Sequence, residues 1–327
     1  MPKNLSEFEI IAKYFSPLAQ GSAGALGLTD DVALLEPREG CQLVLTKDIL
    51  TENVHFFTDD DPRLLAKKLL RVNLSDLAAK GAKPMGYLLG LVLPKETGES
   101  WFASFAEGLA EDNKEFGITL LGGDTVSHAG ALSLSLTAVG EIKSGQAILR
   151  KGARTGDNIY VTGTLGDSAL GLQILKLELE GIEEKDVEYL TSRYFLPQPR
   201  VALGKHLPGI VSAGMDISDG LIQDLGHLCH QSGVGAMIEF SRLPLSQSAK
   251  AVISHRPDMA EQIATGGDDY ELLLTAPEEM EDTLVALAAK ANVALTNIGR
   301  IVKTPGVICY GGQNNVIRFK SAGYQHF

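Results

Sequence analysis

Asp216-Ile217-Ser218-Asp219-Gly220 follows an apolar run and precedes a helical pattern, so these residues mark a strand-to-helix junction. In the extended part, Asp216 and Ser218 point to one side of the chain, and Asp219 begins the helix. A helix cap formed by Ser218 or Asp219 is a common use of such residues. Two carboxylates exceed what one cap requires, so we interpret this segment as part of a functional site.

Further segments also place aspartates at the ends of apolar runs. They are Thr29-Asp30-Asp31, Thr46-Lys47-Asp48, Asn73-Leu74-Ser75-Asp76, Gly122-Gly123-Asp124-Thr125 and Gly266-Gly267-Asp268-Asp269-Tyr270. Carboxylates gathered in one cleft repel one another unless they are protonated or bind a cation. Mg²⁺ takes oxygen ligands and commonly keeps substrate phosphates as further ligands. The pattern therefore predicts a metal-dependent enzyme that acts on phosphates. Because P-loop and protein-kinase signatures are missing, metal carboxylates and helix N-termini would hold those phosphates.

The glycine pair at 122 and 123 is expected to follow the end of a strand. Glycines there permit a close approach of the backbone to an anion and offer it N–H groups. Asp124 would bind the metal that the same anion shares. A tight turn with Asp124 as its cap is the alternative interpretation.

Other candidate residues give a less specific signal. Asp76 continues the apolar stripe of a helix, which predicts a position near a partner or a cleft. His55 is a candidate contact for an anionic or aromatic substrate, although a lone histidine beside aromatics is more often packed or exposed. Arg150 opens a basic cluster that would clamp a triphosphate or form a solvated linker. The loop at 163–168 resembles a phosphate-binding loop only loosely.

The composition is that of an ordinary globular protein. The 327 residues are 44% hydrophobic and 21% charged, and they suggest two domains or one large one. The formal charge of −12, from 41 acidic and 29 basic residues, disfavours nucleic-acid binding. No run approaches the ~20 apolar residues of a membrane span, and no secretory signal is visible. Three widely spaced cysteines fit a reducing compartment, so a cytoplasmic location is expected.

A stretch rich in Gly, Lys and Arg near 142–157 divides the chain, and we predict domains at 1–146 and 147–327. In the first domain, strands are expected at 32–35, 42–46, 85–93, 118–121 and 131–142, and helices at 62–80 and 99–116. In the second, strands are expected at 158–162, 234–239, 271–275, 296–301 and 307–310, and helices from 169 and at 184–195, 199–206, 219–231 and 277–290. This mixture predicts an α/β protein.

Taken in order, the acidic and glycine-rich segments resemble those of the thiamine-monophosphate kinase family over nearly the whole chain. The stretches that carry the resemblance are Asp30-Asp31-Val32-Ala33-Leu34, Asn53-Val54-His55-Phe56, Asn73-Leu74-Ser75-Asp76-Leu77-Ala78-Ala79, Gly122-Gly123-Asp124-Thr125, Val161-Thr162-Gly163-Thr164-Leu165-Gly166-Asp167-Ser168-Ala169, Asp216-Ile217-Ser218-Asp219-Gly220-Leu221 and Gly267-Asp268-Asp269-Tyr270-Glu271-Leu272. The resemblance implies the fold shared with aminoimidazole ribonucleotide synthetase: two α/β domains of mixed sheets packed with helices, usually as a homodimer. It also implies that ATP and several Mg²⁺ ions bind in a cleft, and that ATP phosphorylates thiamine monophosphate to thiamine diphosphate.

Carried over position by position, the resemblance implies three sets of site residues. The metal ligands would be Asp31, Thr46, Asp48, Asp76, Asp124, Asp216 and Asp219. The contacts to ATP would be Gly123, Asp124, Arg150 and Ser218, and the contacts to the vitamin substrate would be His55, Asp268 and Tyr324. The acceptor is a phosphate monoester that is already ionised near neutral pH, so no general base is expected. Transfer would be direct and in line, without a phosphoenzyme.

Several positions depart from the family pattern. Lys47 stands where a second threonine is usual, so a hydroxyl ligand is lost or Lys47 replaces a cation. Val126 and Ser127 stand in place of a Thr-Arg pair, which removes a possible phosphate-binding arginine. Ser321 stands where an aromatic residue stacks on the substrate, and Tyr324 is the candidate to take that place.

Alternatives to this kinase remain open at this point. Selenophosphate synthetase and the hydrogenase-maturation dehydratase share the superfamily but use a reactive cysteine near one end of the chain. Here the first cysteine is Cys41, and the tail from Gly323 has none, which argues against both of these enzymes. A non-catalytic nucleotide sensor of the same superfamily is favoured by Lys47 and Ser127. Such a sensor would bind ATP without consuming it.

Overall fold

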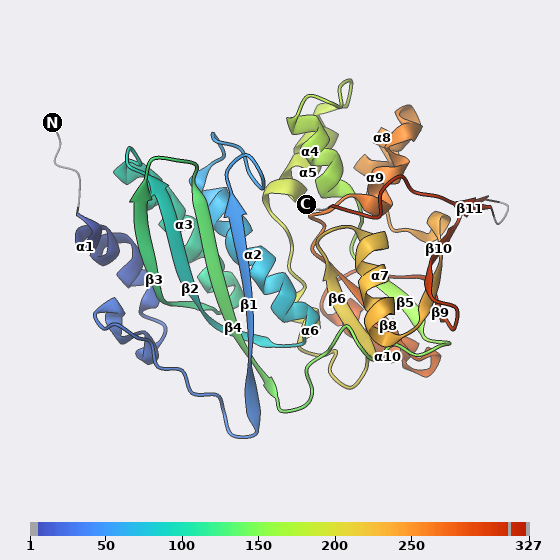
Figure 1. Cartoon of the computed structure of the whole chain (residues 1–327), viewed down its shortest axis with the longest axis horizontal. Coiled ribbons are helices and arrows are strands. Elements are labelled where there is room, and N and C mark those ends of the chain that lie inside the picture. Colours follow the sequence, from blue (N-terminus) through green and yellow to red (C-terminus); the bar gives the residue numbers. More distant parts are fainter. Residues whose placement is uncertain (1–5, 313–314, 325–327) are drawn as a thin grey trace. The chain divides into compact units, whose positions relative to one another are not determined.

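The computed structural model describes residues 6–312 and 315–324, and these form two compact units (Figure 1). The first unit contains the described residues up to Leu77 together with Ala82–Gly145. The second contains Ala78–Gly81 and the described residues from Gln146 onward. Each unit has its own sheet and its own set of buried apolar side chains, so each is described by itself.

Helices and strands alternate irregularly in the first unit. Its elements are α1 (Glu7–Ile10), α2 (Pro62–Ala79, whose last two residues belong to the second unit), α3 (Glu99–Phe116), β1 (Cys41–Thr51), β2 (Lys83–Pro94), β3 (Thr119–His128) and β4 (Ser133–Lys143). The strands of the described residues are ordered β1-β4-β2-β3. β2 and β3 run parallel, and the other neighbours are antiparallel.

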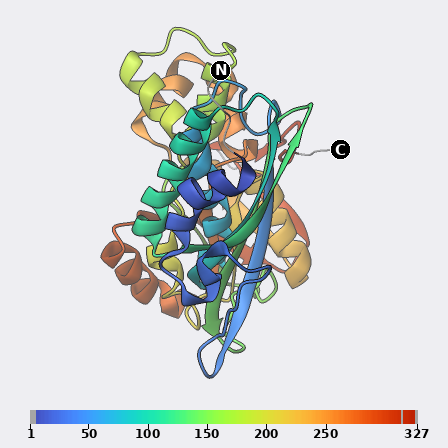
Figure 2. The same ribbon diagram turned by 90° about the vertical axis from the view of Figure 1, so that its left-hand side faces the viewer.

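The two faces of this sheet differ in polarity and cover. Helices α2 and α3 lie on one face (Figure 2), where Leu91, Leu134 and Leu136 are buried. Side chains alternate along a strand, so their neighbours point to the other face. We call this second surface the open face, and it consists of Leu45, Lys47, Ile49, Leu88, Gly90, Asp124, Val126, Ser135 and Thr137. Its apolar members Leu45, Ile49, Leu88 and Val126 are 44–65% exposed.

Helix α2 begins as the sequence predicts. Asp61 Oδ1 accepts a hydrogen bond from the N–H of Arg63 at 2.9 Å, and Pro62 takes the first helical position. The apolar stripe that includes Leu69 is buried against the sheet, and Asp76 follows on the same stripe. The helix thereby carries the Asp76 carboxylate to β1.

The second unit is built around a larger mixed sheet. Its helices are α4 (Asp167–Leu175), α5 (Glu184–Phe195), α6 (Val201–Gly204), α7 (Leu221–Ser232), α8 (Gln247–His255), α9 (Ala260–Thr265) and α10 (Glu281–Lys290). Its strands are β5 (Asn158–Thr162), β6 (Ala213–Ile217), β7 (Gly235–Glu239), β8 (Glu271–Ala276), β9 (Leu295–Val302), β10 (Gly306–Tyr310) and β11 (Val316–Ile317), and their order in the sheet is β11-β10-β7-β9-β5-β8-β6.

The central strands of the second unit are buried on both sides. Every residue of β5, β6 and β8 is buried, which explains why successive residues at the centres of β5 and β8 are apolar and do not alternate with polar ones. Ile159 and Leu273 belong to the core on one face, and Tyr160 and Leu272 to the core on the other. Helices therefore cover both faces, and the predicted class of mixed sheets packed with helices is confirmed. None of the described helices combines the length and apolar character that a membrane span requires.

The structure corrects two local predictions in the first unit. Residues 32–35 form no strand, because Val32 and Leu34 are exposed and pair with no neighbouring strand. The strand expected at 118–121 does not end at the glycines, since β3 continues to His128. Asp124 therefore lies within a strand and caps no turn. A Cβ on Gly123 would lie 2.0 Å from Leu89 O, so glycine is required by the close approach of β2 and β3.

Candidate active site

Thr46 and Asp48 point from β1 toward helix α2. Thr46 Oγ1 donates a hydrogen bond to Asp76 Oδ2, and strand alternation places Asp48 on the same side. Burial and then the charge of Asp76 raise the pKa of Asp48 to about 7, and the charge of Lys47 acts in the opposite direction. Asp48 Oδ2 is buried and has no hydrogen-bond partner among the described residues. A buried carboxylate oxygen without a donor is favourable only if it is protonated or binds a cation.

A cavity of about 470 Å³ lies on the open face of the same sheet. Its charged lining residues include Asp30, Asp31, Lys47 and Asp124. Lys47 lies between Thr46 and Asp48 in sequence, so it points the other way, and its Nζ donates to the hydroxyl of Ser135. Asp31 and Asp124 are therefore brought together around the cavity. The sheet separates them from the group of Thr46, Asp48 and Asp76, which the sequence had placed in the same ligand set.

In the second unit, Asp216 lies near the end of β6, as predicted. Helix α7 begins at Leu221, so Asp219 lies before the helix and does not begin it as predicted. Neither Ser218 nor Asp219 caps the helix, because the N-cap is Gly220, which has no side chain. Instead, Asp224 Oδ2 accepts hydrogen bonds from the N–H groups of residues 218, 219 and 220, at 3.1, 3.1 and 3.2 Å. Sequence reasoning missed Asp224. Its signal was an acidic residue in the first turn of a helix.

Asp224 is almost completely buried, and its environment changes its protonation. Burial and then the negative charge of Asp219 raise the pKa of Asp224 to about 7, while the three backbone N–H groups lower it. The Asp224 carboxylate is thus stabilised by three backbone N–H donors and destabilised by the negative charge of Asp219.

The segment at 266–270 packs against the segment at 216–220. The N–H of Asp268 donates to Ser218 O at 2.8 Å, and the N–H of Tyr270 donates to Ile217 O at 2.8 Å. Asp268 and Tyr270 both have positive φ, at 67° and 52°, which is uncommon for residues other than glycine. Strained backbone of this kind is concentrated at functional sites. The structure therefore places Asp268 beside Ser218, as expected of one site.

Tyr324 also reaches this region. Its N–H donates to Asp219 O at 3.0 Å. Gln223 Nε2 donates both to Tyr324 O, at 2.9 Å, and to Asp219 Oδ2, at 3.0 Å. The described end of the chain is thereby held against a candidate metal ligand, and the Tyr324 residue is 47% exposed.

Within the second unit, Arg150 lies apart from Ser218. Arg150 O accepts a hydrogen bond from Ser232 Oγ at 3.0 Å, at the far end of α7 from Ser218. With a rise of 1.5 Å per residue, the ends of α7 are roughly 16 Å apart. His55 belongs to the first unit, where its Nδ1 accepts a hydrogen bond from the N–H of Thr51 at 3.1 Å. This contact assigns the proton of the neutral ring to Nε2, which makes that atom a donor.

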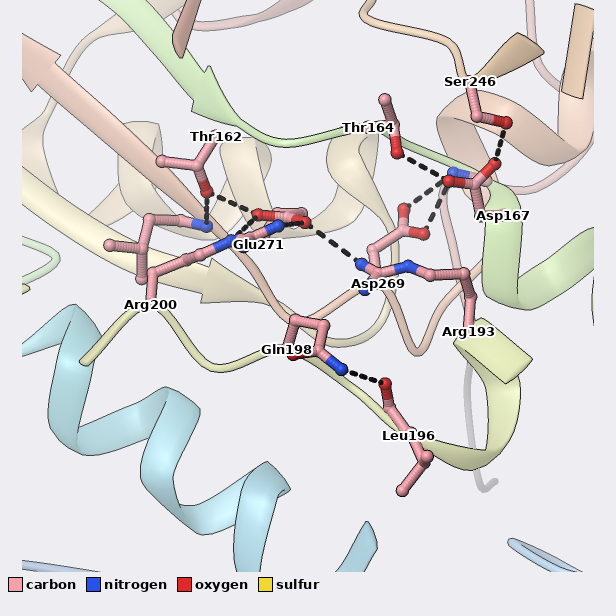
Figure 3. A network of polar contacts seen from close by, with 12 residues as sticks. Thr162, Thr164, Asp167, Arg193, Leu196, Gln198, Arg200, Ser246, Asp269 and Glu271 are labelled. Carbon is pink, nitrogen blue, oxygen red and sulfur yellow. Dashed lines mark hydrogen bonds and ion pairs between the residues drawn. The ribbon is translucent and has the colours of Figure 1, made fainter. Parts of the chain in front are cut away.

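Glu271, which directly follows the 266–270 segment in the chain, is the centre of a buried network of hydrogen bonds (Figure 3). Its carboxylate accepts hydrogen bonds from Thr162 Oγ1 at 2.7 Å, Arg200 Nε at 2.6 Å and Arg193 at 3.1 Å, with a second bond from Arg200. Glu271 is fully buried. Sequence reasoning identified Glu271 only as part of a motif, since its two arginine partners lie some 70–80 residues away.

The loop at 163–168 uses its backbone for an internal carboxylate. The N–H of Gly166 donates to both oxygens of Asp269, at 2.9 and 3.0 Å (Figure 3). Complete burial is the main cause that raises the pKa of Asp269 well above its usual range. Asp167, at the start of α4, accepts hydrogen bonds from Thr164 and Ser246, both at 2.5 Å. The amide of Gly166 is therefore occupied by Asp269, and the loop forms the turn between β5 and α4.

The oxygen-rich groups fit Mg²⁺ better than a softer metal. Within residues 6–312 and 315–324, no group of three or more His, Cys, Asp or Glu side chains is arranged to hold a metal by itself. Mg²⁺ is commonly held by one or two carboxylates, with water and substrate phosphates as its other ligands. The pair of Asp48 and Asp76, with the hydroxyl of Thr46 beside it, meets that requirement.

Comparison with known proteins defines the class. Residues 29–142 match the N-terminal domain of AIR synthase related proteins, and residues 154–311 match the C-terminal domain of the same proteins. The chain therefore belongs to the AIR synthase related family, whose two domains it contains.

Individual relatives narrow the family. The thiamine-monophosphate kinase of Caulobacter vibrioides is 40% identical over 308 residues, which cover 93% of this chain and 86% of that protein. The crystal structure of thiamine-monophosphate kinase from Stenotrophomonas maltophilia K279a is 40% identical, with a TM-score of 0.81 and coverage of 88% of this chain and 90% of that one. The structure of AaThiL complexed with AMPPCP and TMP is 32% identical, with a TM-score of 0.79 and coverage of 99% and 97%. Within the AIR synthase related family, the chain is a member of the thiamine-monophosphate kinases and hence an enzyme.

Proposed function

We propose that this enzyme transfers the γ-phosphoryl group of ATP to thiamine monophosphate, producing thiamine diphosphate, with the help of several Mg²⁺ ions. Similarity over nearly the full length to a protein that binds AMPPCP and TMP supports these substrates. The structural observation that supports the proposal most directly is the buried Asp48 Oδ2, which has no donor among the described residues and lies near the Asp76 charge. Such an arrangement is unfavourable for the ionised carboxylate unless a cation completes it.

We assign metal binding to oxygen donors of both units. In the first unit they are Asp31, Thr46, Asp48, Asp76 and Asp124, and in the second they are Asp216 and Asp219. Bound Mg²⁺ would neutralise phosphate charge and so reduce the repulsion between two polyanions. Lys47 adds a fixed positive charge to the cavity on the open face, which is consistent with its replacing a cation there.

The remaining candidates bind the two substrates. Gly123, Asp124, Arg150 and Ser218 are assigned to ATP, and His55, Asp268 and Tyr324 to thiamine monophosphate. Asp124 lines the 470 Å³ cavity together with the backbone of Gly123, which supports phosphate binding at that surface. Nε2 of His55 is a donor suited to an anionic oxygen. Because the acceptor phosphate is already ionised, the side chains position the substrates and remove no proton.

The two domains of this proposal have the bounds 1–146 and 147–327. The first would bind ATP and Mg²⁺, and the second, an α/β domain, would contribute Ser218, Asp219 and Asp268. The free thiols of Cys41, Cys229 and Cys309 support a reducing compartment, and we place the enzyme in the cytoplasm.

We propose that the enzyme is a homodimer that pairs through the open face. The apolar side chains of Leu45, Ile49, Leu88 and Val126 gather on one side of one sheet, where 44–65% of each is exposed. Contiguous exposed apolar surface of this kind is typical of protein interfaces. A second copy of the same face is the simplest occupant, because soluble oligomers are most often symmetric dimers.

The reaction is tested by incubating the purified protein with ATP, Mg²⁺ and thiamine monophosphate and identifying the products. Thiamine diphosphate and ADP in equal amounts are expected. A non-catalytic nucleotide sensor would bind ATP in a calorimeter and leave thiamine monophosphate unchanged. That outcome, with folded protein, would disprove the proposed function.

A further inference from the structure

Asp224 closes a ring of three backbone donors. The N–H groups of Ser218, Asp219 and Gly220 all reach the same oxygen, Oδ2, at 3.1–3.2 Å. Successive N–H groups converge in this way when the backbone forms a concave nest, which normally receives an anion. Here the anion is a side chain of the same chain, and it comes from inside the first turn of α7.

The shape of the 216–220 segment depends on this contact. Gly220 has φ 124° and ψ 145°, and a Cβ at this position would lie 2.7 Å from Thr265 O. The N-cap position is therefore restricted to glycine, and no side chain there can fix the loop. The backbone N–H of Asp224 also donates to Gly220 O at 3.0 Å, so Asp224 holds the segment through both its backbone and its carboxylate.

The segment that Asp224 holds carries side chains of the proposed site. Asp219 is the second of the three donor residues, and Asp216 lies two residues before Ser218, the first of them. Ser218 O also accepts a hydrogen bond from the N–H of Asp268. A shift of this peptide would therefore move the 266–270 segment as well. Gln223, the residue before Asp224 in the helix, donates a hydrogen bond from Nε2 to Asp219 Oδ2 at 3.0 Å.

A purely structural cap would not need a buried charge. Asp224 is 1% exposed, and a buried carboxylate is unfavourable unless several hydrogen bonds compensate for its lost hydration. A serine or asparagine side chain caps a helix without that penalty. Hydrogen bonds from N–H groups to a carboxylate are stronger than those to a neutral cap, so three donors on one oxygen favour a carboxylate at this position.

We propose that Asp224 is a positioning residue, which fixes the peptide planes of residues 218–220 so that Asp216 and Asp219 are held ready to bind Mg²⁺. This inference rests on the proposed function, in which these two aspartates are metal ligands. Residues that orient metal ligands typically contribute 10–100-fold to metal affinity or activity.

The test compares full-length wild-type protein with Asp224→Asn and Asp224→Ala. Asp186→Asn is the matched control, because Asp186 is a buried carboxylate of the same unit that accepts one hydrogen bond, from Ser248 Oγ at 2.7 Å. Three quantities are measured: amide hydrogen exchange of the peptide spanning 217–220, Mg²⁺ affinity by calorimetry without substrate, and kcat with KM for both substrates.

Asp224→Ala is expected to speed exchange in this peptide at least tenfold and to weaken Mg²⁺ binding by about 10–100-fold. The exchange rate and Mg²⁺ affinity of Asp224→Asn should lie between those of the wild type and Asp224→Ala, because the amide oxygen of asparagine still accepts N–H bonds. Asp186→Asn should match the wild type in both. In both Asp224 variants, kcat at subsaturating Mg²⁺ should fall and recover as Mg²⁺ is raised.

Wild-type exchange and Mg²⁺ affinity in Asp224→Asn would overturn the inference even if Asp224→Ala fails to fold. Equal losses in Asp186→Asn would also overturn it, because they would indicate a general loss of stability. Failure of the wild type to produce thiamine diphosphate would instead disprove the proposed function, since the exchange measurement needs no substrate.

Discussion

Asp76 acts on Asp48 across the helix-covered face of the first sheet, and its charge is one of the two causes that raise the pKa of Asp48 to about 7. Burial is the larger cause. Thr46 donates to Asp76, whereas Asp48 Oδ2 has no donor among the described residues. The unequal environments of the two carboxylates lead to testable consequences in the metal-free protein.

The stability of the metal-free protein should decrease as the pH rises from about 4 to 8. Native Asp48 keeps its proton up to about pH 7, whereas in the unfolded chain it loses the proton near its ordinary pKa of 3.8. The native state therefore binds more protons in this window, and the free energy of unfolding falls with pH. Asp48→Asn should stabilise the metal-free protein at pH 8 by roughly 2–4 kcal/mol.

Urea unfolding in the presence of a chelator measures this effect. The difference between wild type and Asp48→Asn should shrink by more than half at pH 5, where native Asp48 is already neutral. A difference that is the same at both pH values would show that ionisation of Asp48 is not its cause.

Bound Mg²⁺ should offset the destabilisation that ionised Asp48 causes beside the charge of Asp76. A ligand that binds only the folded state at a concentration 100 times its Kd stabilises that state by about 2.7 kcal/mol. Wild-type protein should gain stability on this scale, whereas Asp48→Ala and Asp76→Ala should gain much less. The control is Asp186→Asn, which should respond as the wild type does. An equal Mg²⁺ response in all four proteins would exclude Asp48 and Asp76 as ligands.

The Glu271 network should matter for stability far more than an exposed ion pair. Glu271→Gln would leave Arg193 and Arg200 without their buried counter-charge, and breaking such a pair is destabilising by about 3–5 kcal/mol. The matched variant is Glu278→Gln, which breaks the exposed 3.3 Å pair with Arg300 and should change stability by roughly 0–1 kcal/mol. Urea unfolding of both variants measures the loss in the free energy of unfolding. Equal losses in Glu271→Gln and Glu278→Gln would contradict this prediction.

Ile49→Lys should convert the proposed dimer to a monomer. Ile49 lies on the open face and is 54% exposed, so a charge there adds little strain within one chain but would be buried against a second copy. Leu177→Lys is the control, because Leu177 is 77% exposed in the second unit. Sedimentation velocity should report a dimer for wild type and Leu177→Lys and a monomer for Ile49→Lys. A dimer in all three would place the interface elsewhere.

The helices and central strands were predictable because their signals are local. Asp61 and Pro62 mark the start of α2, and the apolar residues at the centres of β5 and β8 follow from burial on both faces. The strand predicted at 32–35 was wrong because a short apolar run alone cannot show whether a neighbouring strand exists. The strand predicted at 118–121 ended too early, because glycines normally weaken strands. Here Gly123 lies within β3, where it is needed for the close contact with β2.

The division of the candidate ligands could not be predicted from the order of motifs. Adjacent residues of β1 point to opposite faces, so Asp48 joins Asp76 while Lys47 joins the cavity lined by Asp124. Asp224 and Glu271 were missed for a related reason. Their importance comes from donors brought to them by the fold, such as the converging N–H groups of 218–220 and the distant guanidinium of Arg200.

The central claim is that acidic residues of this chain promote the transfer of phosphate from ATP to thiamine monophosphate. The most direct test is the initial rate of thiamine diphosphate formation at saturating ATP, Mg²⁺ and thiamine monophosphate, compared among wild type, Asp48→Ala and Asp186→Asn. The wild type and Asp186→Asn should turn over at similar rates, and folded Asp48→Ala should form no detectable thiamine diphosphate. Near-normal turnover by Asp48→Ala, or no thiamine diphosphate from the folded wild type, would contradict the claim.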